Sequence, residues 1–559
     1  MLLRDVRVHV AELTAMRVEN IRRASRLAAR LLVVALLGRN LGAQAAAVVG
    51  SLSGDRARLA RITGDTAFHS SSPEIPWMTR LPETRITRLL AKAPITFVRP
   101  DLSLAWNSAL PLSINDGPMW AGRGWNMALS AGISARATVP VIGGSIRIAF
   151  VPTALLSENL PFEVLPGRTP GLSAYSNPIH GADSPIDLPI RFGDSPIARW
   201  DLGRSEAEYR NESVSLGATS ANESWGPGIR NPLVMSTNAP GIPRLFLRTV
   251  APIKTRYGAL GVRLTTGVLT KSPFYAPGSP GYRSFSGMLL TLTPSPDSAF
   301  EIGLARAVYA PIGPTFKGAV DHAVDAIWHW EWQRTPADTN AAGETLQRAD
   351  QITSVFARWI VPESGLEIYG EWARQEMPRS ITELIMAPLH TGGYTLGFQW
   401  ARRQGSGHYL RAQAEVTNVE QTQVIAGRPT VDFYIGRATE FGYTQRGQIV
   451  GAATGPGGSS QWFAGDYVTH RWHAGAFVGR IRWENDALYR EPLANVWRHD
   501  VTVFGGVRGA WRSGLTDIGV DATIGYRYNY LFQNGQANPG GYRTVDVRNY
   551  TVTMRFTPR

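Results

Sequence analysis

The feature that most constrains how this chain can fold is an alternation of apolar and polar residues with a period of two. Residues 548–556 read RNYTVTMRF, and Tyr550, Val552, Met554 and Phe556 alternate there with Asn, Thr and Arg residues. Successive side chains of a β-strand point to opposite faces of the sheet, so four such dyads predict a strand with one apolar and one polar face.

The same alternation recurs through much of the chain. Its clearest examples are GVDATIGYRYNYLF (519–532), YLRAQAEVTNV (409–419), GLEIYGEWAR (365–374) and residues 501–511, with weaker examples at 258–270 and 298–309. Clusters of Gly, Pro, Asn and Asp, which favour turns, separate these segments. We therefore predict an all-β protein built from many antiparallel strands.

Two architectures fit strands of this kind. A soluble β-sandwich buries the apolar faces in a core, whereas a membrane β-barrel turns them toward lipid and encloses the polar faces in a lumen. Here the polar faces repeatedly carry Arg, Glu and Gln at mid-strand, and Tyr and Trp crowd the strand ends, as in an aromatic girdle. We predict a transmembrane antiparallel β-barrel, which has to close because lipid cannot satisfy an open sheet edge. A soluble all-β protein is the alternative.

The length of the chain bounds the size of the barrel. Residues 101–559 can supply about 16–18 strands with loops of moderate length. A closing strand that ends in Phe, as at Phe556, is typical of outer-membrane barrels and is read by the outer-membrane assembly machinery. Beyond the N-terminal region no run of about 18 apolar residues occurs, so a transmembrane helix is not predicted.

The first 45 residues are predicted to be a secretory signal peptide. Arginines at 22–30 precede an apolar run at 31–37, and the AQA at 43–45 supplies the small residues of a cleavage site. Met16 is an alternative start, and a short amphipathic helix is the alternative interpretation. Cleavage would leave the protein periplasmic, exported or inserted in an outer membrane.

Residues 46–100 are predicted to be a periplasmic segment that precedes the barrel. Within it, PETRITRLLAKAPI (82–95) places Ile86, Leu89 and Leu90 at helical spacing. This pattern predicts a short helix, with an irregular loop as the alternative.

Composition and charge exclude several classes of function. The chain has no Cys, so disulfide scaffolds, thiolate metal sites and cysteine nucleophiles are excluded. The net charge is +13, but the basic residues are scattered and form no run typical of nucleic-acid binding. Scattered arginines can equally face an anionic polymer or lipopolysaccharide.

Two long segments resemble motifs of the Wzi-type capsule assembly family. ESWGPGIRNPLVMSTNAPGIPRLFL (223–247) is similar to the family pattern WGxGxxNPLLMSNNAPGFPHLFL, and GQIVGAATGPGGSSQ (447–461) is similar to GQxxGAxxGPGSxSQ. GLEIYGEWAR (365–374) resembles an acidic-aromatic strand of that family. Thr237 and Arg244 depart from the family's Asn and His. The resemblance implies an outer-membrane barrel that holds capsular polysaccharide on the cell surface.

The residues of these segments also suit a polysaccharide on chemical grounds. Aromatic rings stack on sugar rings, guanidinium groups pair with the carboxylates of acidic sugars, and amides bond hydroxyl groups. The purely structural alternative is that Gly and Pro shape loops and the aromatic residues form a girdle. The predicted polysaccharide-binding residues are Trp225, Arg230, Asn231, Asn238, Arg244, Glu371, Tyr443, Arg446, Gln448, Gln461 and Trp462.

We therefore expect a monomeric, non-enzymatic outer-membrane barrel without cofactor or metal. It would bind capsular polysaccharide or exopolysaccharide at its outer mouth, contact outer-membrane lipid and lipopolysaccharide, and assist capsule assembly. A porin-like transport channel is the first alternative. A membrane enzyme acting on lipid or glycan is the second, although neither an HExxH nor a GxSxG motif is present. His322 with nearby acids, and the glutamates around Glu371, are the residues such an enzyme would use.

Overall fold

A computed structural model gives the fold. It describes residues 51–65, 95–140, 143–165, 170–180, 185–276, 281–294, 299–314, 316–329, 349–378, 380–421, 432–490, 498–514, 516–533 and 546–558. The predicted signal peptide (1–45) lies outside these residues, as does the predicted helix at 82–95 except for its last residue, Ile95. That residue opens the first strand, which begins before the predicted boundary at 101.

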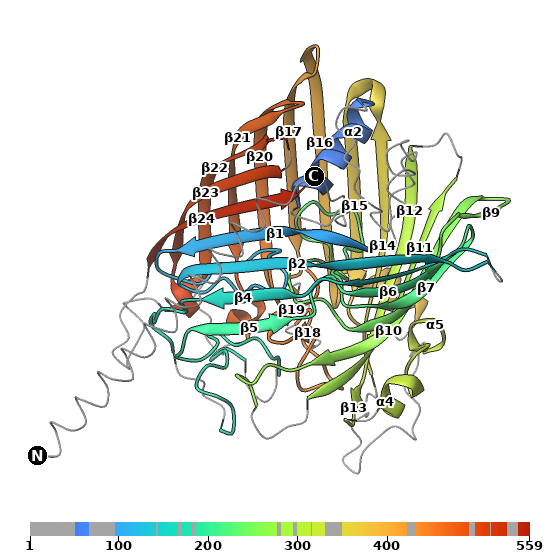
Figure 1. The fold of residues 1–559 in the computed structure, drawn as a ribbon. Coiled ribbons are helices and arrows are strands. Elements are labelled where there is room, and N and C mark those ends of the chain that lie inside the picture. The colour runs from blue at the N-terminus through green and yellow to red at the C-terminus, as the bar shows by residue number, and fades with distance from the viewer. Residues whose placement is uncertain are drawn as a thin grey trace, which may run out of the picture.

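One antiparallel sheet closes on itself to form a barrel (Figure 1). The first strand, β1, pairs on one side with β2 and on the other with the last strand, β24. The sheet has 22 segments, but β3 and β4, β5 and β6, β8 and β9, and β12 and β13 each continue one strand across an interruption. The wall is therefore an 18-strand barrel, which confirms the predicted fold class.

The wall strands follow one another around the barrel in chain order. Their bounds are β1 (Ile95–Asn107), β2 (Gly124–Thr138), β3 (Ser145–Phe150), β4 (Thr153–Ser157), β5 (Ile197–Asp201), β6 (Glu206–Arg210), β7 (Val214–Thr219), β8 (Arg244–Thr249), β9 (Ile253–Thr255), β10 (Gly258–Thr270), β11 (Tyr282–Thr293), β12 (Phe300–Tyr309), β13 (Pro311–Ile312), β14 (Asp350–Val361), β15 (Leu366–Arg374), β16 (Gly392–Gly405), β17 (His408–Asn418), β20 (Ser459–Thr469), β21 (Trp472–Arg482), β22 (Val501–Arg512), β23 (Thr516–Tyr528) and β24 (Val547–Pro558).

In the part of the chain that the structure describes, five short helices and two 3-10 turns lie between or before the strands. They are α2 (Leu52–Thr63), α4 (Phe316–Asp321), α5 (Asp325–Trp328), α6 (Ile381–Met386), α7 (Asn485–Tyr489), η3 (Pro362–Ser364) and η6 (Tyr530–Phe532). Among the described residues, no helix combines the length and the apolar character needed to cross a membrane.

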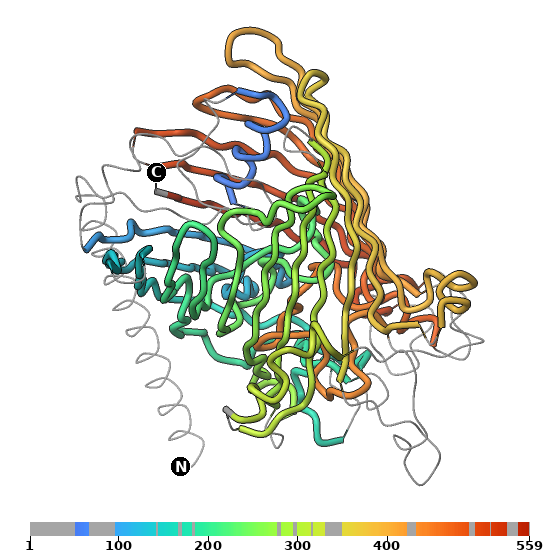
Figure 2. Tube along the Cα trace, turned by 90° about the vertical axis from the view of Figure 1, so that its right-hand side faces the viewer, coloured from blue at the N-terminus to red at the C-terminus, as the bar shows by residue number. Residues whose placement is uncertain are grey.

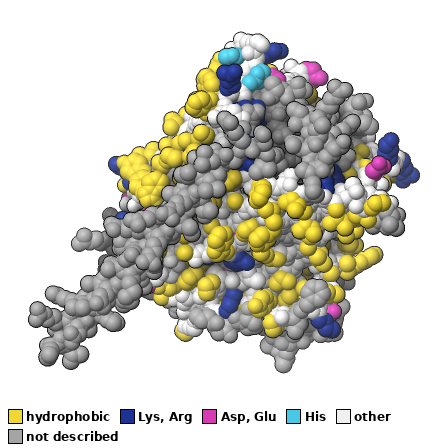
Figure 3. All heavy atoms as spheres, viewed as in Figure 1, with side chains coloured by type: hydrophobic (Ala, Val, Ile, Leu, Met, Phe, Trp, Pro, Cys, Tyr) yellow, Lys and Arg dark blue, Asp and Glu magenta, His cyan; other side chains and the backbone are white. Residues whose placement is uncertain are grey.

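The two faces of the wall differ as the alternation predicts. On the outer face Val507 is 61% exposed and Phe463 is 49% exposed, whereas on the lumenal face Glu367 is 0% exposed. Hydrophobic side chains gather over the outside of the strands in Figure 3. An apolar exterior around a charged interior is the arrangement of a barrel in lipid, because lipid takes the place of a core.

Aromatic residues form two rows on the outer face. At the end where the long loops connect the strands, the exposed aromatic residues include Trp125, Tyr282, Tyr528 and Tyr550. At the opposite end they include Tyr257, Trp359, Trp472 and Trp511. Trp and Tyr favour the two membrane–water interfaces, so the rows mark the two borders of the lipid-facing band.

The two ends of the barrel have different connections. At the short-turn end, strands are joined by residues 256–257, 362–365, 406–407 and 470–471, and β1 starts and β24 ends there. At the long-loop end, the connections include residues 158–196, 313–349 and 419–458. In outer-membrane barrels short turns lie on the periplasmic side and long loops outside, so the long-loop end is the outer mouth.

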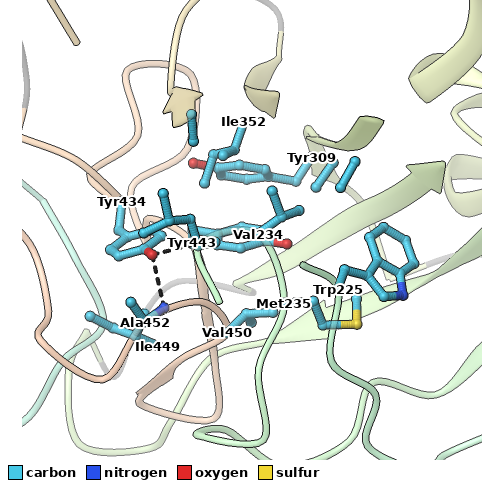
Figure 4. Packing of buried hydrophobic residues seen from close by; sticks show 14 of the residues in the cluster. Trp225, Val234, Met235, Tyr309, Ile352, Tyr434, Tyr443, Ile449, Val450 and Ala452 are labelled. Atoms are coloured by element: carbon cyan, nitrogen blue, oxygen red, sulfur yellow. Dashed lines mark hydrogen bonds between the residues drawn. The ribbon is translucent and has the colours of Figure 1, made fainter. Parts of the chain in front are cut away.

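Two of the long connections fold into the lumen instead of standing above it. We call residues 220–243 plug segment A and residues 432–458 plug segment B. Plug segment B contains a small hairpin, β18 (Thr444–Gln445) paired with β19 (Gln448–Ile449). Side chains of both segments form an apolar cluster with lumenal residues of β10–β12, β14 and β15, part of which Figure 4 shows. The lumen therefore holds a packed core on the side of these strands.

Helix α2 lies in the lumen near the short-turn end. Ser51 caps its first turn by accepting a hydrogen bond from the N–H of Gly54 (3.1 Å), and Gly64 ends it in the left-handed conformation. Its apolar residues Leu59 and Ile62 pack with wall residues such as Ile360 in one buried cluster. Figures 1 and 2 show the helix (blue) beside the strands of the wall.

Candidate functional site

Plug segment A is held by a wall glutamate that accepts hydrogen bonds from its backbone. Glu415 on β17 accepts from the N–H groups of Ile229 (2.5 Å), Arg230 (3.1 Å) and Asn231 (2.8 Å). The hydroxyl of Tyr369 donates to the same carboxylate at 2.8 Å. Three consecutive N–H groups around one carboxylate fix the turn of the segment, and they leave the side chain of Arg230 free to point elsewhere.

A second wall glutamate, Glu371 on β15, also holds plug segment A. Its carboxylate accepts from the N–H of Leu233 at 3.1 Å and lies against Gly226, where an added Cβ would come within 2.6 Å of it. Glu371 is fully buried. In this structure it contacts the plug, and no ligand can reach its carboxylate.

Glu223 ties plug segment A to strands β8 and β10. It accepts from Arg244 (2.5 Å), from Arg263 and from the indole N–H of Trp225 (3.2 Å). Burial by itself raises the pKa of Glu223, but Arg244 and Arg263 outweigh this effect and lower the pKa from 4.5 to about 2. The predicted binding residue Arg244 is therefore occupied by an internal ion pair.

The shifted pKa of Glu223 predicts an acid-sensitive plug. A carboxylate whose pKa is lower in the folded state contributes full stability above its unfolded pKa and loses that contribution as the pH falls from about 4.5 to about 2. We expect cleavage of plug segment A by an acid protease to rise over this range. In Glu223→Gln the rise is expected to be absent, because Gln does not titrate. Equal pH profiles for the two proteins would contradict the prediction.

Two of the three aromatic residues predicted for the site, Trp225 and Tyr443, are buried in the lumen. Trp225 is 0% exposed and packs near Phe285, with ring centroids 6.5 Å apart. Tyr443, also 0% exposed, stacks on Tyr434 with an angle of 15° between the rings and lies near Tyr309 (Figure 4). Neither Trp225 nor Tyr443 offers a face on which a sugar ring could stack.

The predicted amides connect the plug segments to each other and to the wall. The side-chain N–H of Asn238 donates to the carbonyl of Ile449 (3.1 Å), and that of Gln448 donates to the carbonyl of Asn238 (3.0 Å). Asn231 donates to the hydroxyl of Ser460 on β20 at 3.1 Å. These bonds cross between segments A and B and the wall, so the three residues help to fix the plug.

Arg446 and Gln461 lie apart from the other predicted residues. Arg446 sits in the left-handed conformation in the turn of the β18–β19 hairpin and pairs with Asp201 at 2.6 Å. Gln461 lies on the same face of β20 as the outward-facing Phe463 and accepts from Arg480 at 3.2 Å. The structure therefore does not gather all eleven predicted residues into one site.

Four of the predicted residues, Arg230, Asn238, Gln448 and Trp462, do line a common space. It is a cavity of about 450 Å³ between the plug and the wall formed by β20–β24. Its lining extends from residues of α2 near the short-turn end to Tyr530 and Leu531 at the long-loop end. This lumenal cavity is the candidate functional site.

Trp462 is the aromatic centre of the lumenal cavity. The guanidinium carbons of Arg230 and Arg508 lie 5.0 Å and 5.1 Å from the centroid of its ring. Such distances suit cation–π contacts. Trp462 is 3% exposed, and its indole N–H has no hydrogen-bond partner among the described residues.

The sequence did not single out several charged residues of the cavity. Arg508 pairs with Asp466 at 2.6 Å, and Arg555 lies 3.3 Å from Asp116 and 3.5 Å from Asp521. The alternation does place Arg508, Asp521 and Arg555 on the polar faces of their strands. It cannot tell which lumenal residues face open space and which contact the plug, because that depends on where the loops fold.

The described residues contain no group of three or more His, Asp or Glu that could hold a metal ion. His322 and Asp325 do meet, with 2.6 Å between Nδ1 and the carboxylate, but His322 follows α4 and Asp325 begins α5, both outside the cavity lining.

Solved structures of outer-membrane β-barrels are distantly similar to this chain. No family model and no curated protein matches the sequence. Among solved structures, Wzi of Escherichia coli, described as a carbohydrate-binding β-barrel involved in group 1 capsule assembly, is 10% identical with a TM-score of 0.49, covering 85% of this chain and 86% of that one. OprB of Pseudomonas putida is 13% identical with a TM-score of 0.36, covering 88% and 100% of the two chains. The outer-membrane protein opdK of Pseudomonas aeruginosa is 10% identical with a TM-score of 0.36, covering 82% and 98%.

At these identities the assignment to the Wzi-type family stays a prediction from the two sequence segments. Sequence identities this low do not transfer a function from these proteins to this chain.

Proposed function

We propose that this protein is a non-enzymatic outer-membrane barrel that binds capsular polysaccharide or exopolysaccharide and assists its attachment to the cell surface. The observation that carries the proposal is the filled lumen. Plug segments A and B and helix α2 occupy it with paired polar groups and a packed apolar cluster, and the lumenal cavity between plug and wall is lined by guanidinium, indole and amide groups. These are the groups that recognise sugars and their carboxylates.

The position of the cavity supports binding from the outside. Its lining includes loop residues of the long-loop end, among them Asn177, Glu484 and Tyr530. A polymer that enters there would meet many weak contacts, and repetition along the chain would make its attachment strong. No bond of the polymer needs to be made or broken.

The proposal is tested by surface retention of the polymer. In the native host, loss of the protein is expected to move polysaccharide from the cell surface into the medium, and the intact protein is expected to restore it. Trp462→Ala is expected to reduce retention while barrel assembly, followed by heat modifiability on gels, is kept. Normal retention in a strain that lacks the protein would overturn the proposal.

A porin-like channel is the second candidate, because the cavity lining runs from α2 to the long-loop end. A channel and a polysaccharide anchor predict opposite results in planar bilayers. Large, stable conductance steps of the intact protein would favour a channel, and their absence would favour the anchor. An enzyme would instead turn over labelled glycan or lipopolysaccharide and lose that activity on substitution of His322.

A further inference from the structure

We propose that the lumenal cavity binds a uronic acid unit, a sugar that bears one carboxylate, with Arg230 as its charge partner. The inference rests on the proposed function, which supplies polysaccharide as the ligand. It adds the chemical class of the sugar and the residues that select it.

Arg230 is the cation on which the inference depends. Its backbone is bound by Glu415, but its guanidinium group makes no hydrogen bond or ion pair with any described residue, and its guanidinium carbon lies 5.0 Å from the centroid of the Trp462 ring. Burial lowers the pKa of Arg230, and Arg508 and Arg555 act in the same direction, while Glu415 and Asp521 oppose them. A half-buried guanidinium group that makes no ion pair favours an anionic ligand.

The acids around the cavity are already engaged by other cations. Asp116 and Asp521 both face Arg555, and Asp466 binds Arg508. On the lining contributed by α2, Asp55 pairs with Arg411 at 2.7 Å. Of the cations named here, only Arg230 makes no ion pair with a described residue, so its single positive charge can meet a ligand. A carboxylate carries one negative charge, whereas a phosphate monoester carries nearly two at neutral pH.

Polar atoms without protein partners surround the same space. The side-chain oxygens of Asn115, Gln448 and Thr454 and the indole N–H of Trp462 are buried, line the cavity and have no hydrogen-bond partner among the described residues. Buried polar groups are normally paired, so these atoms suit the hydroxyl groups of a sugar. The cavity, at about 450 Å³, falls in the range of roughly 300–1,000 Å³ in which proteins bind small molecules.

The test measures binding of two matched probes to the full-length protein in detergent, by isothermal titration calorimetry. One probe is an oligosaccharide that contains glucuronic acid, and the other is the same oligosaccharide with its carboxylates reduced to alcohols. The intact protein is expected to bind the acidic probe about 10- to 100-fold more tightly, which corresponds to one charge-assisted bidentate contact. In Arg230→Gln this preference is expected to vanish while the affinity for the reduced probe is kept.

Two further variants guard against a trivial loss of binding. Arg402→Gln removes an exposed arginine near the short-turn end and is expected to bind both probes as the intact protein does. Arg230→Lys keeps the charge without the planar fork and is expected to retain part of the preference.

Equal affinity of the intact protein for the two probes, or an unchanged preference in Arg230→Gln, would overturn the inference and leave the proposed function intact. Failure to bind either probe would also overturn it, and the retention assay would then decide the proposed function separately. Tighter binding of a sugar phosphate than of the uronic acid would contradict the assignment to carboxylates.

Discussion

Replacing Glu367 with Gln is expected to lower the free energy of unfolding by about 3–5 kcal/mol, the usual cost of removing one partner from a buried ion pair. Glu367 on β15 accepts from Arg58 of helix α2 (2.8 Å) and from Arg358 of β14 (2.5 Å), and it is fully buried. Gln keeps the volume but removes the negative charge that both guanidinium groups share. Unfolding in denaturant, followed by tryptophan fluorescence in detergent micelles, measures the change.

The same substitution is expected to release helix α2. Arg58 also donates to the carbonyl of Pro227 in plug segment A at 2.6 Å, so it connects the helix, the wall and the plug. Protease should therefore cleave α2 in Glu367→Gln before the barrel unfolds. Glu363→Gln, in the exposed turn η3 beside the same strand, is the matched control and is expected to change stability by less than about 0.5 kcal/mol. Equal stability of the two variants would refute this role of Glu367.

Replacing Gly226 with Val is expected to cost about 3 kcal/mol and to displace plug segment A. Gly226 has a φ of +106°, which L-residues rarely adopt, and an added Cβ would meet the carboxylate of Glu371 at 2.6 Å. The wall itself is not altered, so the barrel should still assemble. Protease cleavage within plug segment A and the midpoint of unfolding measure the two effects.

Gly313→Val is the control for this substitution. Gly313 lies in an exposed loop, has no positive φ and has no atom within 4 Å of an added Cβ. We expect its stability to stay within about 0.5 kcal/mol of the intact protein. If Gly226→Val were equally mild, the close approach of plug segment A to β15 would be wrong.

The sequence predicted the strands well because their pattern is local. Val503, Val507 and Trp511 share one face by the period of two alone, and all three point outward in the barrel. The N-terminal helix is different. It occurs at 52–63, where the apolar residues show no helical spacing that would predict it. It is held by ion pairs with residues more than 300 positions away along the chain.

In the candidate site, too, some features follow from the local sequence and others only from the packing. Residue chemistry alone selected Trp225, Tyr443 and Trp462 as equivalent aromatic faces. Only the packing separates them, since Trp225 and Tyr443 enter the apolar cluster whereas Trp462 borders the lumenal cavity. In the same way, the sequence alone does not distinguish Arg230 from Arg244, but of these two arginines only Arg244 pairs with Glu223.

The sequence by itself determined that this protein is a closed sheet with an apolar exterior and a charged interior. The reason is that successive side chains of a strand point to alternate faces, so the position of a residue in the strand sets its direction. The tertiary structure alone decided what fills the interior. Segment A folds inward because the wall carboxylates of Glu415 and Glu371 bind its backbone N–H groups, and Asp350 of β14 binds backbone N–H groups of segment B in the same way. Such contacts join residues far apart in the chain and leave no periodic trace in either segment.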